Sequence, residues 1–339
     1  MKSVGVTSEC IAIGYRDGTC AIIRPNEHVT LFDAHTDIID ITMASDLAAT
    51  TIALATPSAA IVFDCNLDES RCRNPLQVGT RLDGHEGRVT GVALNPYSFA
   101  SREIGSAQPF LISADERGNV HRWRRGIGNS PRETTRVHRK AVHHLGIYTM
   151  PERGRAFITA SDDRDIVVHA LDEDRVDHRL NAHVGWIEQV LSVEDESILQ
   201  FLVIADRVGV AVWDIQTKRV ILRFRGRPRM EVVALSDPER VLVAAGIDDS
   251  VLIARPGCLR RVDLGRLSGG VRAVSLSTVA RKVVLWVAIE DLVIARDVAT
   301  ERIMGQRRFP ANILRMKAWK RASGVLVILE DGSNWILRC

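Results

Sequence analysis

Histidine side chains, which can ligate metal ions or transfer protons, concentrate in the middle of the sequence. Seven of the ten histidines lie in this stretch, namely His121, His138, His143, His144, His169, His178 and His183. His143 and His144 are adjacent, so on a strand they would point to opposite faces. His138 and His183 occupy one recurring position of a repeat, described below, and therefore have a structural explanation. We expect no metal site and no cofactor.

The sequence also lacks the motifs of the common enzyme classes. It contains no G-x-S-x-G, no G-x-x-x-x-G-K-[ST], no H-E-x-x-H and no strand followed by G-x-G-x-x-G. Acidic pairs such as Asp162-Asp163 and Asp248-Asp249 fall at equivalent places between apolar runs, where acidic residues commonly form turns. We expect no catalytic residues and a protein that is not an enzyme.

One pattern recurs along the whole chain: an apolar run, a short acidic or glycine turn, and a second apolar run. A clear instance joins residues 111–113 to residues 120–123 through Arg117-Gly118. The turns fall near residues 17, 57, 117, 163, 207, 248, 290 and 331, in steps of 40, 60, 46, 44, 41, 42 and 41. The longest step contains two polar insertions, near 66–80 and 95–109. A period of about 40–45 residues is typical of four-stranded propeller blades.

The apolar runs are short and rich in Val, Ile and Leu, which indicates strands and not helices. A β-sandwich also contains successive hairpins, but its strands do not recur as similar units of about 40 residues. We therefore predict an all-β fold, a propeller of four-stranded antiparallel blades, as a single domain over 1–339. Eight units favour eight blades. The alternatives are seven blades plus one separately packed unit, or a part of a larger array of two rings.

A histidine precedes the first strand in four units, at His35, His85, His138 and His183. The fifth unit ends in Val212-Trp213-Asp214, a literal Trp-Asp pair. The chain resembles the WD-repeat (WD40) β-propeller family over essentially its whole length. The resemblance is strongest in units three to five and is degenerate at both ends.

The resemblance implies a buried tetrad in each blade, formed by the histidine, a strand Ser or Thr, a turn Asp and the Trp. In unit three the matching residues are His85, Ser113 and Trp123. In unit four they are His138, Asp163 and either Thr159 or Ser161. In unit five they are His183 and Trp213. Unit three has Arg117 where the family has Asp, and unit four has His169 in place of Trp. No unit matches at all four positions, and we expect these residues to have structural roles.

Two residues are candidates for partner binding because they follow the repeat histidine by three positions. They are Arg88 in unit three and Trp186 in unit five, and both residue types are enriched at interface hot spots. For Trp186 the alternative is packing between blades, and for Arg88 it is ordinary solvation.

A basic segment offers a second candidate surface. Arg223, Arg225, Arg227 and Arg229 alternate with other residues, which places them on one side of an extended segment. Charges on an outer edge strand also discourage aggregation, which is the structural alternative. Otherwise the strip would bind an acidic peptide, a phosphate or a nucleic-acid backbone. Phe224 alone provides no aromatic platform for bases, so we do not expect specific nucleic-acid binding.

The small net charge of +3 conceals a strong asymmetry. Residues 1–214 contain 22 Lys+Arg and 30 Asp+Glu, a balance of −8, whereas residues 215–339 contain 23 and 12, a balance of +11. In a ring these would be opposite arcs, an acidic side and a basic side. Such polarity favours oriented docking to proteins with acidic segments, or head-to-tail contact with a second copy.

These observations favour a non-enzymatic scaffold that holds protein partners in a complex. The alternatives are a sensory or autoinhibitory module of a larger signalling protein, and a propeller enzyme with a site in its central channel. The chain has 46% hydrophobic and 26% charged residues, and its six cysteines form no C-x-x-C pair. No apolar segment has the length of a membrane span, and the start does not resemble a secretory signal. We expect a cytoplasmic protein with reduced thiols.

Overall fold

The computed structural model consists of antiparallel β-sheets. It describes residues 3–6, 11–14, 17–23, 30–33, 36–45, 49–66, 80–95, 110–124, 131, 133–151, 154–171, 176–180, 186–195, 198–225, 233–237, 240–247, 250–255, 258–262, 271–280, 282–319 and 324–338. Strands, joined by turns, make up the regular structure of these residues. Within them no helix is long and apolar enough to cross a membrane.

Contacts divide the chain into two compact units. Unit 1 comprises residues 1–149 and 153–186, and unit 2 comprises residues 150–152 and 187–339. Each unit contains several sheets built in the same way, with strands that neighbour one another in both sequence and space. We describe the two units separately.

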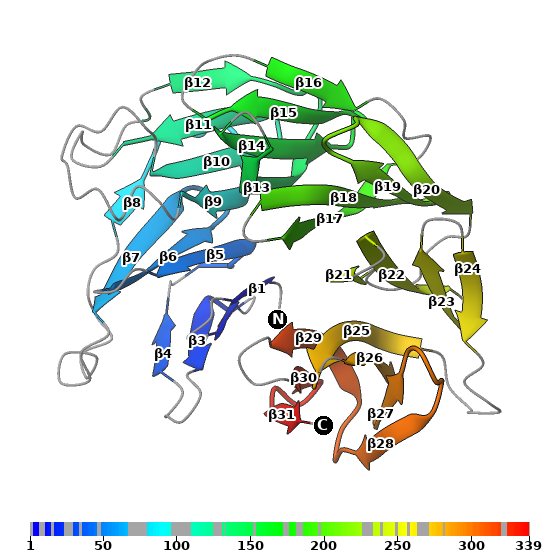
Figure 1. Ribbon diagram of the computed structural model, residues 1–339. Helices are drawn as coiled ribbons and strands as arrows, with labels where there is room; N and C mark the ends of the chain where they lie inside the picture. Colours follow the sequence, from blue (N-terminus) through cyan, green and yellow to red (C-terminus); the bar gives the residue numbers. More distant parts are fainter. Residues whose placement is uncertain are drawn as a thin grey trace. The chain divides into compact units, whose positions relative to one another are not determined.

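The described strands of unit 1 fall into four sets of four that follow one another along the chain (Figure 1), and we call each set a sheet. The first is β1 (Ser3–Val6), β2 (Ile11–Gly14), β3 (Thr19–Ile23) and β4 (Thr30–Asp33), and the second is β5 (Asp40–Ser45), β6 (Ala49–Ala55), β7 (Ala60–Asn66) and β8 (Thr80–Leu82). The third is β9 (Val89–Leu94), β10 (Leu111–Asp115), β11 (Asn119–Trp123) and β12 (Glu133–Arg136). The fourth is β13 (Val142–Met150), β14 (Gly154–Ser161), β15 (Ile166–Ala170) and β16 (Val176–Leu180).

Unit 2 repeats this design, and its last sheet has three strands among the described residues. Its first two sheets are β17 (Ile187–Asp195), β18 (Ile198–Asp206), β19 (Gly209–Asp214) and β20 (Arg219–Arg225), then β21 (Val233–Asp237), β22 (Arg240–Ile247), β23 (Ser250–Arg255) and β24 (Cys258–Val262). The other two are β25 (Val271–Val279), β26 (Lys282–Ile289), β27 (Leu292–Asp297) and β28 (Ile303–Arg308), then β29 (Ile313–Trp319), β30 (Gly324–Leu329) and β31 (Asn334–Arg338).

The hairpin turns lie where the sequence places them. The turns expected near residues 117, 163 and 207 join β10 to β11, β14 to β15 and β18 to β19, so these predictions are confirmed. Ser3–Val6 is the first strand of the first sheet, because it pairs with β2. The turn expected near residue 248 and most of the two insertions, residues 67–79 and 96–109, lie outside the described residues.

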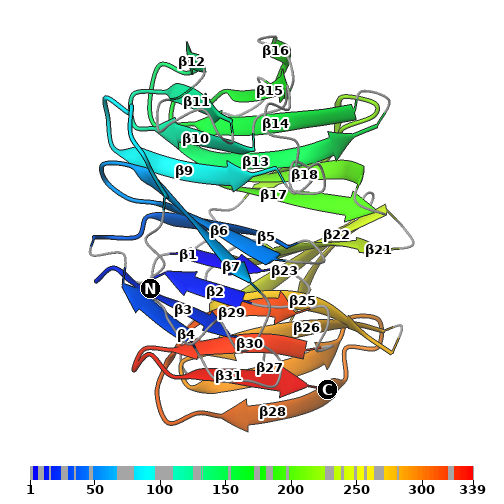
Figure 2. The ribbon, with the colours of Figure 1, turned by 90° about the vertical axis from the view of Figure 1, so that its left-hand side faces the viewer.

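Inner strands are buried on both faces, because successive sheets within a unit pack against each other. In β10, for example, Leu111 belongs to a core cluster shared with β5–β8, and its neighbour Ile112 to one shared with β13–β15. β10, β19 and β30 are buried at every position. β28 is the last strand of its sheet (Figure 2). Unlike the inner strands, it is exposed at all six positions.

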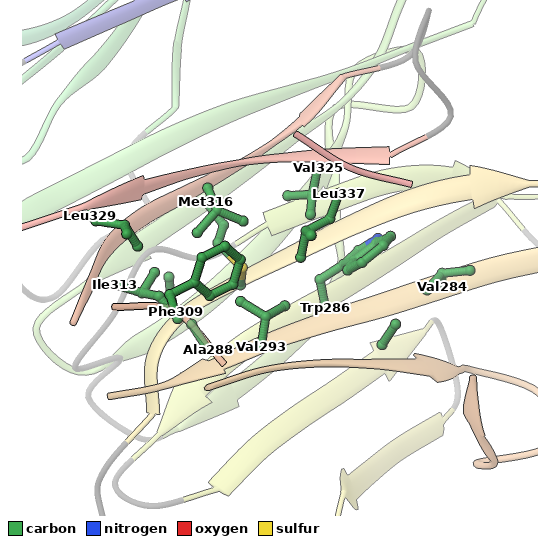
Figure 3. Packing of buried hydrophobic residues seen from close by; sticks show 13 residues of the cluster. Val284, Trp286, Ala288, Val293, Phe309, Ile313, Met316, Val325, Leu329 and Leu337 are labelled. Atoms are coloured by element: carbon green, nitrogen blue, oxygen red, sulfur yellow. The ribbon is translucent and has the colours of Figure 1, made fainter. Parts of the chain in front are cut away.

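The core of unit 2 includes a cluster between β25–β28 and β29–β31 (Figure 3). Trp286, Phe309, Met316 and Leu337 are among its buried side chains. The indole Nε1 of Trp286 donates a hydrogen bond to Ser277 Oγ at 2.8 Å. Trp286 therefore fills the cluster while its single polar atom is satisfied.

We predict that Trp286→Ala destabilises unit 2 by about 3–5 kcal/mol, because it leaves a large cavity and removes the donor to Ser277. Urea denaturation followed by circular dichroism measures the change. Trp335→Ala is the matched control: its side chain is 38% exposed, so we expect the cost to be well below that of Trp286→Ala. Equal costs for the two substitutions would contradict this account of the core.

Candidate functional site

The third sheet of unit 1 contains a cluster of polar side chains in an otherwise apolar interior. The hydroxyl of Ser113 on β10 lies 2.7 Å from His85 Nε2, and Trp123 Nε1 on β11 donates a hydrogen bond to it, also at 2.7 Å. Trp123 is almost fully buried. One hydroxyl thus connects the segment before β9 to β10 and β11, and we call His85, Ser113, Asp115 and Trp123 the first clamp.

Asp115 provides the carboxylate of the first clamp, which corrects the expectation that Arg117 stands in its place. Its Oδ2 lies 3.6 Å from His85 Nδ1. Its Oδ1 accepts the backbone N–H groups of Arg117 and Asn119, both at 2.9 Å. The carboxylate comes from the end of β10, two residues earlier than the family pattern requires. All four residue types are therefore present in this sheet, although the carboxylate does not stand at the family's position.

A second clamp lies in the fourth sheet. His138 Nε2 is 2.8 Å from Thr159 Oγ1, and His138 Nδ1 is 3.1 Å from both carboxylate oxygens of Asp163. Thr159 makes this contact, and Ser161 Oγ instead donates to Lys140 O. His169, at the position of the expected Trp, stacks on Phe157 with 4.4 Å between ring centroids.

The two clamps differ at one further position. Ser113 faces His121 across β10 and β11, whereas Thr159, its counterpart, faces Val167. His121 therefore lies on the same face of the sheet as Ser113 and Trp123, with its ring centroid 3.8 Å from that of His85. His121 is one of the histidines that cluster in the sequence, but nothing in the sequence connects it with His85 or Asp115.

A backbone contact joins the two clamps. Gly118, in the turn after Asp115, accepts hydrogen bonds at its carbonyl from Val137 N at 3.0 Å and from His138 N at 3.1 Å. Its φ of 86° lies in the left-handed region, which glycine tolerates best. A Cβ at this position would also collide with the backbone carbonyl of His138. Glycine is therefore required at this contact.

Burial lowers the pKa of both clamp histidines, and the carboxylates beside them only partly offset this. For Asp115, burial acts to raise the pKa, but the imidazoles of His121 and His85 and the N–H groups of Asn119 outweigh it and hold the pKa below its usual value. Asp163 behaves in the same way, with backbone N–H groups and His138 lowering its pKa against the effect of burial. Neutral imidazoles therefore face ionised carboxylates near pH 7.

The fifth unit has no corresponding clamp among the described residues. Trp213 is buried, but its Nε1 has no hydrogen-bond partner there. Leu202 faces Trp213 as Leu111 faces Trp123 in the third sheet. Ile204 therefore stands at the position of Ser113, and it has no hydroxyl to accept a hydrogen bond from the indole. Trp213 therefore forms no tetrad with the described residues, contrary to what the resemblance implies. His183 lies outside the described residues.

His143 and His144 point to different environments, as their adjacency predicts. His143 is exposed, with its Nε2 2.8 Å from Asp162 Oδ2. His144 Nε2 lies 3.1 Å from the hydroxyl of Tyr148. The two side chains do not form a joint metal site.

Both candidate residues near the repeat histidines are exposed. Arg88 is exposed, and its backbone N–H donates to Glu116 Oε1 at 3.2 Å. Trp186 is 41% exposed, with Lys140 Nζ 5.9 Å from its ring centroid. Trp186 is thus accessible at the surface of unit 1.

The basic segment begins on β20, the last strand of its sheet in unit 2. Arg223 and Arg225 are exposed on either side of the buried Phe224, which agrees with the alternation that the sequence predicts. Arg227 and Arg229 lie outside the described residues.

A third group at the surface, in unit 2, is not predicted by the sequence. The guanidinium of Arg307, on β28, lies 4.9 Å from the ring centroid of Trp335 on β31 and 5.6 Å from that of Phe309. The rings of Phe309 and Trp335 meet edge to face at 5.9 Å. We call these three residues the Trp335 cluster. Arg307 and Phe309 are two residues apart in the sequence, but nothing in the sequence indicates that Trp335 contacts them.

Comparison with solved structures identifies the architecture. A computationally designed protein, Ika8, matches with a TM-score of 0.66 and 13% identity over 100% of this chain and 96% of that chain. A chain of the mitotic checkpoint complex matches with a TM-score of 0.58 and 11% identity over 100% and 87% of the two chains. The fold is β-propeller-like. No family model and no curated protein matches the sequence.

The clamp histidines predict a specific dependence of stability on pH. The pKa of His138 is lowered in the folded state, so below about pH 6.5 the unfolded state binds more protons and stability falls as pH falls. The loss is at most about 1.4 kcal/mol per pH unit for one histidine. We expect His138→Gln to reduce this slope between pH 6.5 and 5, as measured by urea denaturation at each pH.

Val142→Ala is the control for the loss of stability itself. Val142 is fully buried in the same sheet, and its substitution removes no titrating group. This variant should be destabilised and should retain the slope of the unmodified protein. A His138→Gln variant with an unchanged slope would show that His138 does not contribute to the acid sensitivity.

Proposed function

We propose that the protein is a non-enzymatic interaction module, a WD-type β-propeller that holds partner proteins in a complex. The observation that carries the proposal is the exposed Trp335 cluster. Trp335 is 38% exposed although it lies on a strand, and Arg307 covers its ring. Trp and Arg are the residue types most enriched at the energetic centres of protein interfaces.

The geometry of the cluster suits binding because its side chains are already held in place. The cation–π contacts of Arg307 with two rings restrict its rotamers before a partner arrives. Phe309 is buried and belongs to the core cluster beneath, so its contacts with Arg307 and with the exposed ring of Trp335 anchor both side chains to the unit. A preorganised surface loses less conformational entropy on binding.

The neighbouring strand supports a partner with an extended, acidic segment. β28 lies at the end of its sheet and exposes all six residues, including Ile303 and Met304. Edge strands offer backbone N–H and C=O groups to an added strand. Arg302, Arg307 and Arg308 are exposed there, and residues 215–339 have a charge balance of 23 − 12 = +11.

The finer architecture is part of the same proposal. The eight sequence units and their antiparallel sheets support eight blades of the WD type, and seven blades remain the alternative. The hydrogen bonds of the two clamps support the WD assignment, because they join the residue types expected from that family.

Trp335→Ala should weaken partner binding by about 2 kcal/mol, which is roughly a 30-fold increase in Kd. Quantitative affinity purification of the full chain from its source cells identifies the partners, and titration of a purified partner gives Kd. Val208→Ala is the control, since Val208 is exposed in the turn between β18 and β19 of the same unit. Unchanged recovery of all partners by Trp335→Ala would contradict the proposal, as would turnover of a small molecule by the purified protein.

The double variant Arg223→Glu, Arg225→Glu tests whether the partner is acidic. We expect at least tenfold slower association at low salt and a weaker dependence of the rate on salt, because steering by the basic surface is removed. The control is Arg272→Glu, Arg315→Glu, an equal change in charge at two exposed positions of the same unit. Equal rates for the two double variants would show that the arginines of β20 have no special role.

A further inference from the structure

His85, Asp115 and His121 converge on a small volume inside the third sheet of unit 1. Their nearest ligand atoms, one from each side chain, all lie within 4.8 Å of one another. Asp115 Oδ2 is 3.6 Å from His85 Nδ1 and 3.8 Å from His121 Nε2. The three side chains are 0%, 0% and 2% exposed, in the order His85, Asp115 and His121.

These distances are too long for direct hydrogen bonds. An N–H···O bond spans about 2.7–3.2 Å between its heavy atoms. Among the described residues, His85 Nδ1 and His121 Nε2 have no hydrogen-bond partner. Buried nitrogens are normally paired, so two in one place that face the same carboxylate oxygen require an explanation.

The opposite side of each group is already fixed. His85 Nε2 lies 2.7 Å from Ser113 Oγ, and His121 Nδ1 lies 3.0 Å from Thr134 Oγ1. Asn119 Nδ2 donates to Asp115 Oδ2 at 3.0 Å, in addition to the turn N–H groups that bind Oδ1. Such outer hydrogen bonds orient metal ligands in proteins. Here they leave one nitrogen of each ring directed at the carboxylate.

We propose that His85, Asp115 and His121 bind one divalent transition-metal ion such as Zn²⁺, which would join the segment before β9 to β10 and β11. Zn²⁺ takes His nitrogen and carboxylate oxygen at about 2.0–2.2 Å, so tetrahedral ligand atoms lie about 3.3 Å apart. The observed separations of 3.6 and 3.8 Å are within about half an ångström of this spacing. The two orphaned nitrogens then have a partner.

The charge states of the groups suit a metal ion. Burial lowers the pKa of His85, so its imidazole is neutral and can provide a lone pair. Burial acts to raise the pKa of Asp115, but the nearby imidazoles of His121 and His85 and the N–H groups of Asn119 lower it by more, so the carboxylate stays ionised. The three side chains are enclosed in the protein, which points to a structural role for the ion.

The second clamp provides an internal comparison. There Val167 occupies the position of His121, and Asp163 contacts His138 directly at 3.1 Å. The closer carboxylate satisfies His138 Nδ1 without an ion. The longer distances in the first clamp therefore accompany the additional histidine. This site is separate from the Trp335 cluster, and the proposal does not depend on the proposed function.

The proposal replaces the expectation of no metal site. That expectation considered seven histidines between residues 121 and 183, and it did not include His85, which lies outside that stretch. It also treated acidic residues near the hairpin turns as turn formers only. Asp115 has both roles, because its Oδ1 binds the turn and its Oδ2 faces the imidazoles.

The test uses the full chain, free of any histidine tag and treated with a chelator. Titration with Co²⁺ should give one bound ion per chain and the visible absorption of a tetrahedral Co²⁺ complex, which Zn²⁺ then displaces. Zn²⁺ at 100 times its Kd should lower the unfolding equilibrium constant about 100-fold, as followed by denaturant melts. Absence of a stoichiometric ion in the unmodified protein would overturn the proposal.

His121→Val is the decisive variant, because the fourth sheet tolerates Val at the equivalent position. It should lose at least about 100-fold in Co²⁺ affinity, more than the loss of an outer-shell partner causes. His143→Asn, at an exposed histidine, is the matched control and should bind Co²⁺ like the unmodified protein. Unchanged affinity in a folded His121→Val protein would overturn the proposal. If that variant does not fold, Asp115→Asn and the titration of the unmodified chain decide the question.

Discussion

The inner strands of these sheets are buried on both faces, so each polar group placed on them needs a partner within the protein. This constraint explains why the polar residues of β10, β11 and β14 occur as groups and not singly. Ser113 and Thr159 each contact a histidine, and His138 contacts the carboxylate of Asp163 directly, whereas His85 Nδ1 faces Asp115 Oδ2 at 3.6 Å. An unsatisfied buried polar group costs about 1–3 kcal/mol, which is a large part of the stability of a domain. The hydrogen bonds of the clamps therefore reduce the free-energy cost of placing polar groups on strands that are buried on both faces.

The hairpin pattern could be predicted from sequence because strand alternation and turn residues are local properties. The second clamp could also be predicted, since His138, Thr159 and Asp163 match a known spacing. The first clamp could be predicted only in part. The position of the Asp115 carboxylate depends on a register shift between Ala114 and Asp115 and on backbone N–H groups of the following turn. Neither is encoded in residue spacing alone, and the pairing of Ser113 with His121 becomes visible only when the register is known.

The surface shows the same division between local and long-range information. Exposure of Arg223 and Arg225 follows from strand alternation around Phe224 and was accessible from the sequence. The Trp335 cluster was not, because it joins β28 to β31 through a contact between two sheets. Trp186 shows the limit of residue type as a guide: an indole suits a core and an interface equally well, and only the structure places it at the surface of unit 1.

The hydrogen bonds between Gly118 and the segment of His138 have a consequence for cooperativity. They connect the turn that holds Asp115 to the backbone that carries the histidine of the next sheet. Local opening of β10 and β11 would therefore release the second clamp as well as the first. The third and fourth sheets should open together as one unit in hydrogen exchange, because neither can lose its turn without disturbing its neighbour. A cooperative segment that contains both sheets is longer than one sequence repeat.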